Sequence, residues 1–278
     1  MKAIQKMLLI GCIAMLLACG GTRQQSPQII RIKGSDTMLL LSEKWAQAFM
    51  VAHPGVSVYV SGGGTATGIQ ALIRGDVEIS TASRPINTSE VQQLAAEFQK
   101  IGLAVLVARD ALSVYLHPEN PVSDLTLKQL KEIFSGDIRN WREVGGNDAP
   151  IEVLCRPKKS SGTYAYFREH ILENRDYSTD ALVLQTTGEI VGHIRNHPNA
   201  IGYGGLGYGQ DLRHCRVNSI PATHSSVQYD LYPISRYLYF YTVDKPRGVT
   251  RQFIDWVLSE AGQQIVEESG YIPLWEIK

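Results

Sequence analysis

The strongest constraint on the fold is a regular alternation of short β-branched runs with segments of helical periodicity. Residues 29–32 predict a strand, and apolar side chains in 39–50 then recur at helical spacing until His53-Pro54-Gly55 ends the helix. Further strands are predicted at 56–60, 77–80, 103–108, 113–116, 151–155, 200–203 and 237–242, and helices at 67–74, 87–100, 125–134, 162–173, 187–196 and 249–268. This order is typical of α/β proteins with largely parallel sheets.

The charge balance excludes a partner attracted by a global field. The chain has 278 residues with 27 basic and 27 acidic side chains, and hence no formal net charge. Nucleic acids and anionic membranes attract strongly basic proteins, so we expect neither as a direct partner. An anion would have to be bound by a local site.

The N-terminus has the pattern of an export signal. Lys2 and Lys6 precede an apolar run over 7–17, and small residues then flank Cys19, which resembles a bacterial lipobox. We predict a lipoprotein signal peptide over 1–18, a lipid on Cys19 and a tether over 19–28. The mature protein would lie outside the cytoplasm, held to a bacterial membrane only by its lipid. The alternative is an uncleaved apolar anchor.

Two cysteines remain in the mature chain, Cys155 and Cys215. Outside the cytoplasm such a pair forms a disulfide when its geometry allows. The alternative is two separately buried thiols, and the sequence leaves both open.

Three turns share one design, in which a strand delivers glycine and hydroxyl residues to the start of a helix. They are Gly34-Ser35-Asp36-Thr37, Ser61-Gly62-Gly63-Gly64-Thr65-Ala66-Thr67-Gly68 and Ser160-Ser161-Gly162-Thr163. Free backbone N–H groups, small hydroxyls and close backbone approach together make an oxyanion site. For each turn alone, ordinary helix capping is the competing interpretation.

Two arginines strengthen the oxyanion hypothesis. Arg84 follows the strand predicted at 77–80, and Arg156 ends the strand at 151–155. A guanidinium donates paired N–H groups to a tetrahedral oxyanion. The alternative for either residue is a solvated surface arginine.

Together these residues resemble the phosphate-binding proteins of bacterial phosphate ABC importers. The motifs that carry the likeness are Gly34 to Met38, Ser61 to Gly64, Ala82 to Ile86, Arg156 with Ser161-Gly162-Thr163, Asn120-Pro121, Phe134-Ser135-Gly136 with Asn140-Trp141, and Ala200 to Tyr203. The resemblance implies a two-lobed α/β fold of the periplasmic-binding-protein type II, whose lobes are joined by crossover strands and close on phosphate. We place lobe 1 at 29–110 and 236–278 and lobe 2 at 111–235.

The resemblance also implies the ligand-binding residues and the partner. The predicted contacts are Ser35, Asp36, Thr37, Gly64, Thr65, Thr67, Ser83, Arg84, Arg156, Ser161, Gly162 and Thr163. The closed protein would deliver phosphate, as a monomer, to the permease subunits of an ABC importer.

Two departures from the family pattern bear on selectivity. Some members carry an aspartate where Arg84 stands, and that carboxylate accepts the proton of hydrogen phosphate; here Asp36 is the nearest candidate for the role. The segment from Arg156 to Ser161 is also one residue longer than is common. Sulfate, molybdate or a phosphonate are therefore alternative ligands.

Other functional patterns are weaker. The glycine pattern over 202–207 lacks a following amphipathic helix, so we predict a strand and turn rather than a dinucleotide site. His193 and His197 are spaced for a metal, yet the sequence shows no third ligand. We therefore predict no metal, no cofactor and no catalytic residue. A secreted phosphatase, or an adhesin of the same fold, is the remaining alternative.

Overall fold

The computed structural model describes residues 28–276, so the predicted signal peptide, Cys19 and nearly all of the tether lie outside the described part. The helices are η1 Asp36–Met38, α2 Leu39–Ala52, α3 Thr65–Ile73, α4 Thr88–Phe98, α5 Leu127–Ser135, η2 Trp141–Val144, α6 Gly162–His170, α7 Thr187–Asn196, α8 His224–Gln228, α9 Gly248–Val257 and α10 Glu260–Glu268. The strands are β1 Gln28–Gly34, β2 Val56–Ser61, β3 Ile79–Ala82, β4 Leu103–Leu116, β5 Asp124–Leu125, β6 Glu152–Cys155, β7 Leu182–Val183, β8 Ala200–Gly205, β9 Arg213–Val217 and β10 Ser235–Thr242.

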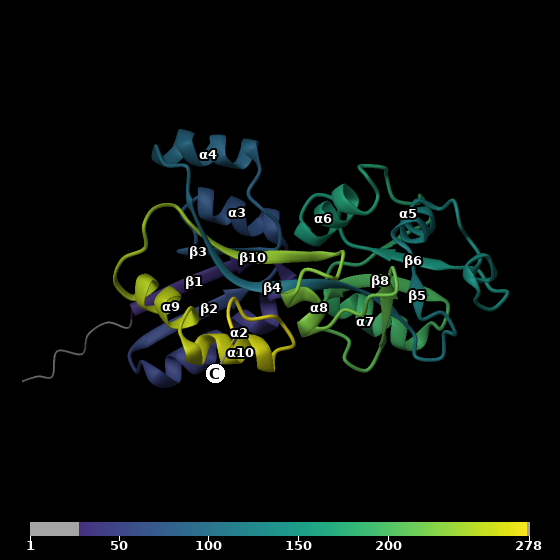
Figure 1. Cartoon of the computed structure of the whole chain (residues 1–278). Helices are drawn as coiled ribbons and strands as arrows, with labels where there is room; N and C mark the ends of the chain where they lie inside the picture. The colour runs from purple at the N-terminus through teal and green to yellow at the C-terminus, as the bar shows by residue number, and fades with distance from the viewer. Residues whose placement is uncertain (1–27, 277–278) are drawn as a thin grey trace, which may run out of the picture.

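The first lobe is built on the parallel strands β2, β1 and β3. Helices α2, α9 and α10 cover one face, and α3 and α4 lie on the other (Figure 1). Because both faces of β1 are covered at its centre, Ile30 and Ile32 are completely or almost completely buried. They pack with Trp45 of α2 and with Phe240 of β10 in one apolar cluster.

Two antiparallel strands join the lobes. β10 pairs with β3 and then with β4 through eight residue pairs, and the register shifts between Leu238 and Tyr239. Beyond Ala111, the same strand β4 leaves β10 and pairs with β8 of the second lobe. β4 thus belongs to both lobes, and Figure 1 shows β4 and β10 running between them.

The second lobe repeats the parallel design. β8, β6 and β7 are parallel neighbours, while β9 pairs with β4 and β5 at the side. Phe134 and Phe167 pack with Tyr203 in an apolar cluster separate from that of the first lobe. The predicted two-lobed α/β fold is confirmed, as is the glycine pattern over 202–207 as strand and turn.

Three details differ from the predicted elements. The predicted strands 103–108 and 113–116 are one strand, because buried residues continue through Asp110 and Ala111. The predicted helix 249–268 is two helices, because the Ser259 hydroxyl accepts the Gly262 N–H and begins α10. The short elements β5, β7, β9, α8, η1 and η2 were not predicted; β5 and β7, of two residues each, carry no periodic signal.

Cys155 and Cys215 are free, buried thiols in the core of the second lobe. The structure therefore has two separately buried thiols rather than a disulfide, and both possibilities were left open by the sequence. Burial raises the pKa of Cys155 to about 11 and that of Cys215 to about 12, so neither thiol is reactive near neutral pH.

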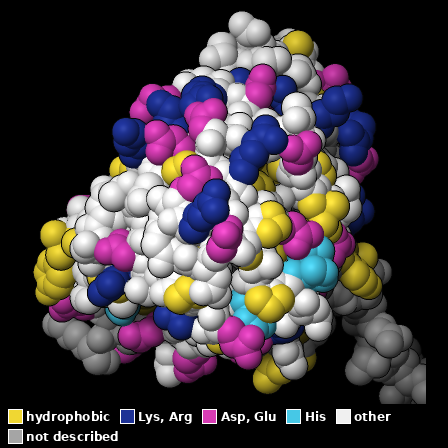
Figure 2. Space-filling view, turned by 90° about the vertical axis from the view of Figure 1, so that its right-hand side faces the viewer, with side chains coloured by type: hydrophobic (Ala, Val, Ile, Leu, Met, Phe, Trp, Pro, Cys, Tyr) yellow, Lys and Arg dark blue, Asp and Glu magenta, His cyan; other side chains and the backbone are white. Residues whose placement is uncertain are grey.

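The face shown in Figure 2 agrees with the neutral composition. On the face that Figure 2 shows, basic and acidic side chains are interspersed, and neither sign forms a continuous field. Within residues 28–276, no helix is long and apolar enough to span a membrane.

Candidate functional site

The turn after β1 places its polar residues at the junction of the lobes. Ser35, Asp36 and Thr37 are all at most 5% exposed. The Ser35 N–H donates to Thr81 O at 3.0 Å, which holds the turn against β3. The Asp36 carboxylate accepts the Gly63 N–H at 2.9 Å, and this contact ties the first turn to the glycine turn.

The matching turn of the second lobe begins α6. The Ser161 hydroxyl accepts the Tyr164 N–H at 3.1 Å and caps the helix, and Gly162 and Thr163 form its first turn. The capping interpretation is thus correct for Ser161. It leaves the Thr163 hydroxyl, which is 2% exposed, facing the first lobe.

Direct hydrogen bonds join the turns of the two lobes. Thr37 Oγ1 and Thr163 Oγ1 share a hydrogen bond of 2.9 Å, and Asp36 Oδ2 lies 2.6 Å from Arg156 Nη2. The Ala66 N–H donates to Ser160 O at 3.1 Å. Residues from three predicted turns therefore meet at one place.

Two glycines allow this close approach. A Cβ at Gly162 would overlap Thr65 Oγ1 of the first lobe, and one at Gly64 would overlap the Ser160 backbone. Gly64 also has φ of 94°, a conformation that favours glycine. Glycine at these positions is thus required by contact between the lobes.

Arg156 is the most deeply buried cation at this junction. It is 2% exposed, and besides Asp36 it donates to Thr187 Oγ1 at 3.0 Å and to Gln185 O at 2.6 Å. Its Nε has no hydrogen-bond partner among the described residues. A buried, unpaired guanidinium donor is costly unless another group accepts from it.

A second buried arginine, Arg236 of β10, was missed in the sequence. It forms a two-bond ion pair with Asp110, which is completely buried, through Nε at 3.0 Å and Nη2 at 2.9 Å. Its Nη groups also donate to Thr37 and Thr163, each at 3.2 Å. Burial raises the pKa of Asp110, and Arg236 opposes that shift by favouring the carboxylate.

A signal for Arg236 was present in the strand pattern. Arg236, Leu238 and Phe240 are buried at alternate positions of β10. The arginine therefore stands at a position where the alternation of the strand predicts an inward-facing, apolar side chain. Two tyrosines at the junction carried no such signal: Tyr208 O–H donates to Asp36 O, and Tyr271 O–H donates to Thr37 O.

The glycine turn places its two threonines differently. Thr65 is fully buried, and its hydroxyl accepts the Ser83 N–H at 3.1 Å and lies 3.4 Å from Ser83 Oγ. These two side chains therefore belong to the junction. The Thr67 hydroxyl instead donates to Gly63 O at 2.8 Å, within its own turn.

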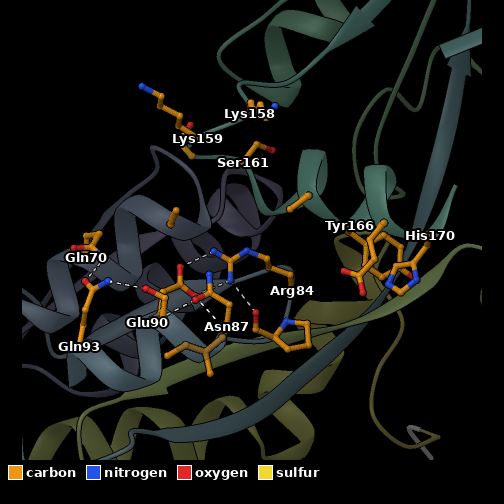
Figure 3. Close-up of a pocket in the computed structure, with 17 residues that line it drawn as sticks. Gln70, Arg84, Asn87, Glu90, Gln93, Lys158, Lys159, Ser161, Tyr166 and His170 are labelled. Atoms are coloured by element: carbon orange, nitrogen blue, oxygen red, sulfur yellow. Dashed lines mark hydrogen bonds and ion pairs between the residues drawn. The ribbon is translucent and has the colours of Figure 1, made fainter. Parts of the chain in front are cut away.

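Arg84 is not part of the buried cluster of Asp36, Thr37, Arg156 and Thr163, whose hydrogen bonds join the lobes. Both its Nη atoms contact the Glu90 carboxylate, at 2.8 and 2.6 Å, within a capping box at the start of α4. Figure 3 shows this pair in a cavity of about 720 Å³ between the lobes, which Ser161, Lys158 and His170 also line. Asp36, Thr37, Arg156 and Thr163 do not line this cavity.

Comparison with known proteins assigns the class first. A family model described as the PBP superfamily domain matches residues 21–261, so the chain is a member of the PBP superfamily. The phosphate-binding protein PstS of Pseudomonas aeruginosa is 31% identical over 264 residues, which cover 87% of this chain and 81% of the relative. PstS of Borreliella burgdorferi is 30% identical, over 98% and 99% of the two chains. Within the superfamily, the chain belongs to the PstS family.

Solved structures agree with the assignment. A putative phosphate ABC transporter substrate-binding protein from Clostridium perfringens, with bound phosphate, aligns with a TM-score of 0.83 at 32% identity, covering 89% of this chain and all of that one. An ABC-type phosphate transport receptor from Vibrio cholerae aligns with a TM-score of 0.71 at 28% identity, covering 88% of this chain and all of that one.

Proposed function

We propose that this protein binds inorganic phosphate between its lobes and delivers it, as a monomer, to the permease of an ABC importer. The observation that carries the proposal is the buried cluster of Asp36, Thr37, Arg156 and Thr163 between the lobes. Relatives named as phosphate-binding proteins, which match almost the full chain, support the same ligand.

The charge of the cluster suits an anion that brings its own proton. Each buried arginine is paired with a buried aspartate, so the cluster is neutral before any ligand enters. A bound anion must then be stabilised by N–H and O–H dipoles and by the unpaired Nε of Arg156. These donors are numerous, because the hydroxyls of Thr37, Thr65 and Ser83 lie in the same cluster.

Asp36 provides the basis for selecting phosphate over sulfate. A carboxylate accepts the proton of hydrogen phosphate, whereas it repels fully ionised sulfate. Arg156 and the Gly63 N–H hold Asp36 in place from both lobes. This arrangement supports Asp36 as the proton acceptor.

Access requires the lobes to separate. The candidate ligands other than Arg84 and Ser161 do not line the cavity of about 720 Å³, and most of them are buried. We propose hinge closure through β4 and β10, the strands that join the lobes. We propose lobe boundaries at 110/111 and 235/236 for the same reason, since β4 changes partner at Ala111 and β10 begins at Ser235.

The decisive experiment is calorimetric titration with phosphate and then sulfate near neutral pH. We expect one tight phosphate site, no binding heat with sulfate and no turnover of a phosphate ester.

Arg156→Gln should abolish measurable phosphate binding because it removes the guanidinium donors. Arg175→Gln is the matched control, since Arg175 lies in the same lobe in a half-exposed pair with Asp137. The proposal would be contradicted if the wild type gave no binding heat with phosphate, or if Arg156→Gln and Arg175→Gln changed phosphate affinity equally.

Membrane attachment forms a separate part of the proposal. We propose that the signal peptide is removed before Cys19 and that lipid on this cysteine holds the protein outside the cytoplasm. Mass spectrometry of the mature N-terminus tests the modification directly. Cys19→Ser should release the protein from membranes, and retention of that variant on membranes would exclude the lipid as the anchor.

A further inference from the structure

Three metal-ligating side chains meet on the second lobe, away from the junction of the lobes. His193 lies in the last turn of α7, His197 follows that helix, and Glu152 begins β6. One ligand atom from each lies within 4.8 Å of the other two. The spacing of the histidines alone is a weak signal, and Glu152, 41 residues away along the chain, supplies the third group that the sequence does not reveal.

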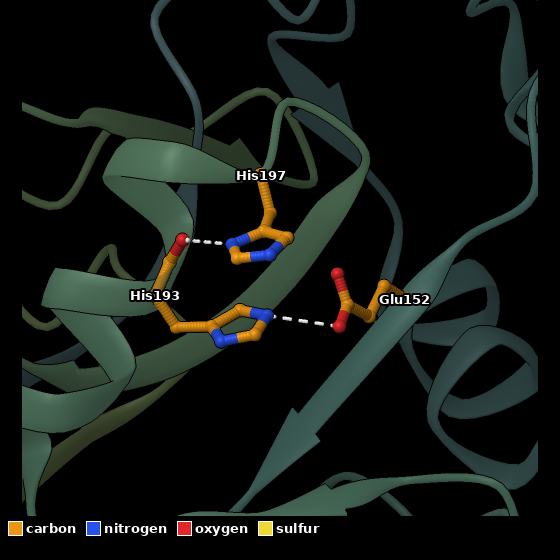
Figure 4. Close-up of side chains that lie close together, drawn as sticks. All are labelled: Glu152, His193 and His197. Carbon is orange, nitrogen blue, oxygen red and sulfur yellow. Dashed lines mark hydrogen bonds and ion pairs between the residues drawn. The ribbon is translucent and has the colours of Figure 1, made fainter.

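The hydrogen bond that His197 makes orients it as a ligand. His197 Nδ1 lies 2.8 Å from His193 O, and because a carbonyl only accepts, this nitrogen carries the proton. The lone pair of His197 is therefore on Nε2. Metal-binding histidines typically donate their other N–H to a carbonyl in this way. His193 Nε2 lies 2.8 Å from Glu152 Oε1, and the two rings stack with centroids 3.8 Å apart (Figure 4).

We propose that Glu152, His193 and His197 bind one divalent transition-metal ion, with Zn²⁺ as the best match. Two imidazoles and one carboxylate with bond lengths of about 2.0–2.2 Å form a common three-ligand zinc set. Nε2 of His193 donates to the Glu152 carboxylate, so to admit the ion His193 must carry its proton on Nδ1 instead and the pair must open slightly. The Glu152 side chain is 39% exposed and has room to do so.

The surroundings favour a cation and leave a coordination position open. The site lies at the C-terminal end of α7, where the helix dipole places partial negative charge. The single carboxylate neutralises half of the charge of a divalent ion. His197 is exposed, so water can complete the tetrahedral coordination. The bound ion would link β6 to the end of α7.

Zn²⁺ titration of the full chain in phosphate-free buffer tests this inference. We expect one Zn²⁺ per chain, and a higher melting temperature in its presence because only the folded state brings the ligands together. His193→Ala and His197→Ala should each lower the affinity at least about tenfold, since even loss of a supporting contact costs 10–100-fold. Substituted Co²⁺ should give the visible absorption of four-coordinate nitrogen and oxygen ligation.

His224→Ala is the matched control. His224 is an exposed histidine with its Nδ1 3.8 Å from the Glu267 carboxylate, and it is not part of the three-residue group. This variant should bind Zn²⁺ like the wild type. Unchanged affinity in folded His197→Ala, or no binding by the wild type at micromolar Zn²⁺, would overturn the proposal. The inference does not rest on phosphate binding.

Discussion

At the scale of single residues, Asp36 combines two roles in one carboxylate. It contacts the backbone of its own lobe through Gly63 and the guanidinium of the other lobe through Arg156. A neutral amide in its place would preserve the shape of the side chain while removing the charge. A single substitution to Asn can therefore separate the role of the side chain's shape from the role of its charge.

Asp36→Asn should reduce discrimination between phosphate and sulfate. Loss of a charged acceptor weakens phosphate binding by about 1.5–3 kcal/mol, roughly ten- to a hundredfold, while the repulsion of sulfate disappears. Calorimetry with both anions measures the ratio. Asp180→Asn, at an exposed aspartate of the second lobe, should leave that ratio as it is in the wild type. An unchanged ratio in Asp36→Asn would remove this carboxylate from the selectivity mechanism.

Arg236→Leu should destabilise the fold strongly. It leaves Asp110 charged and unpaired in the interior, for which breaking a buried pair costs about 3–5 kcal/mol. Arg195→Leu breaks a half-exposed pair with Asp211 and should cost at most about 1 kcal/mol. Urea unfolding of both variants makes the comparison. Similar losses in the two variants would mean that the buried pair has no special structural role.

At the scale of elements, seven of the eleven described helices begin at a residue whose side chain accepts a backbone N–H of the first turn. α4 is the clearest case, since Asn87 Oδ1 accepts the Glu90 N–H and Glu90 accepts the Asn87 N–H. Asn87→Ala should lower the free energy of unfolding by about 1 kcal/mol. Gln92→Ala, at an exposed position inside the same helix, should change it little. Equal unfolding midpoints for the two variants would argue against a stabilising cap.

Local chemistry explains which elements were predictable. α7 was expected at 187–196 and is found there, because the cap Thr186 comes directly before its apolar period and Pro198 follows soon after its end. The division between α9 and α10 was missed because the apolar period continues through Ser259. Turn residues and periodicity thus predict which elements occur better than they predict where each element begins and ends.

The site was predictable only in part, for a different reason. Ser35, Asp36, Thr37, Ser161 and Thr163 stand out because turns concentrate hydroxyl and glycine residues. The contact between Asp36 and Arg156 joins residues 120 apart, and Arg236 reaches Thr37 across 199 residues. Such pairs depend on how the two lobes close, and no local pattern encodes that geometry.

At the scale of the whole molecule, closure depends on how near the lobes can approach. Gly162→Ala should weaken phosphate binding, because the added methyl group overlaps Thr65 Oγ1 and lies close to Ser83 Oγ in the closed arrangement. Stability should change little, since each lobe keeps its own core. Small-angle scattering should show a wider molecule at saturating phosphate than in the wild type.

Gly192→Ala provides the control for Gly162→Ala. It adds the same methyl group in α7, where nothing lies within 4 Å of the new atom. We expect wild-type affinity and scattering. If Gly162→Ala behaves in the same way, close approach at that point is not needed for binding.

The order in which the chain supplies its two cores has a consequence for synthesis. The core of the second lobe draws all its buried residues from 111–234 except Ile272, whereas the first lobe needs Ile30 near one end and Phe253 and Val266 near the other. A chain that emerges from its N-terminus can therefore assemble the second core while the early strands of the first still await β10, α9 and α10. The apolar faces of β1 and α2 are the surfaces left uncovered in that interval, and any chaperone that accompanies the nascent or exported chain should bind there.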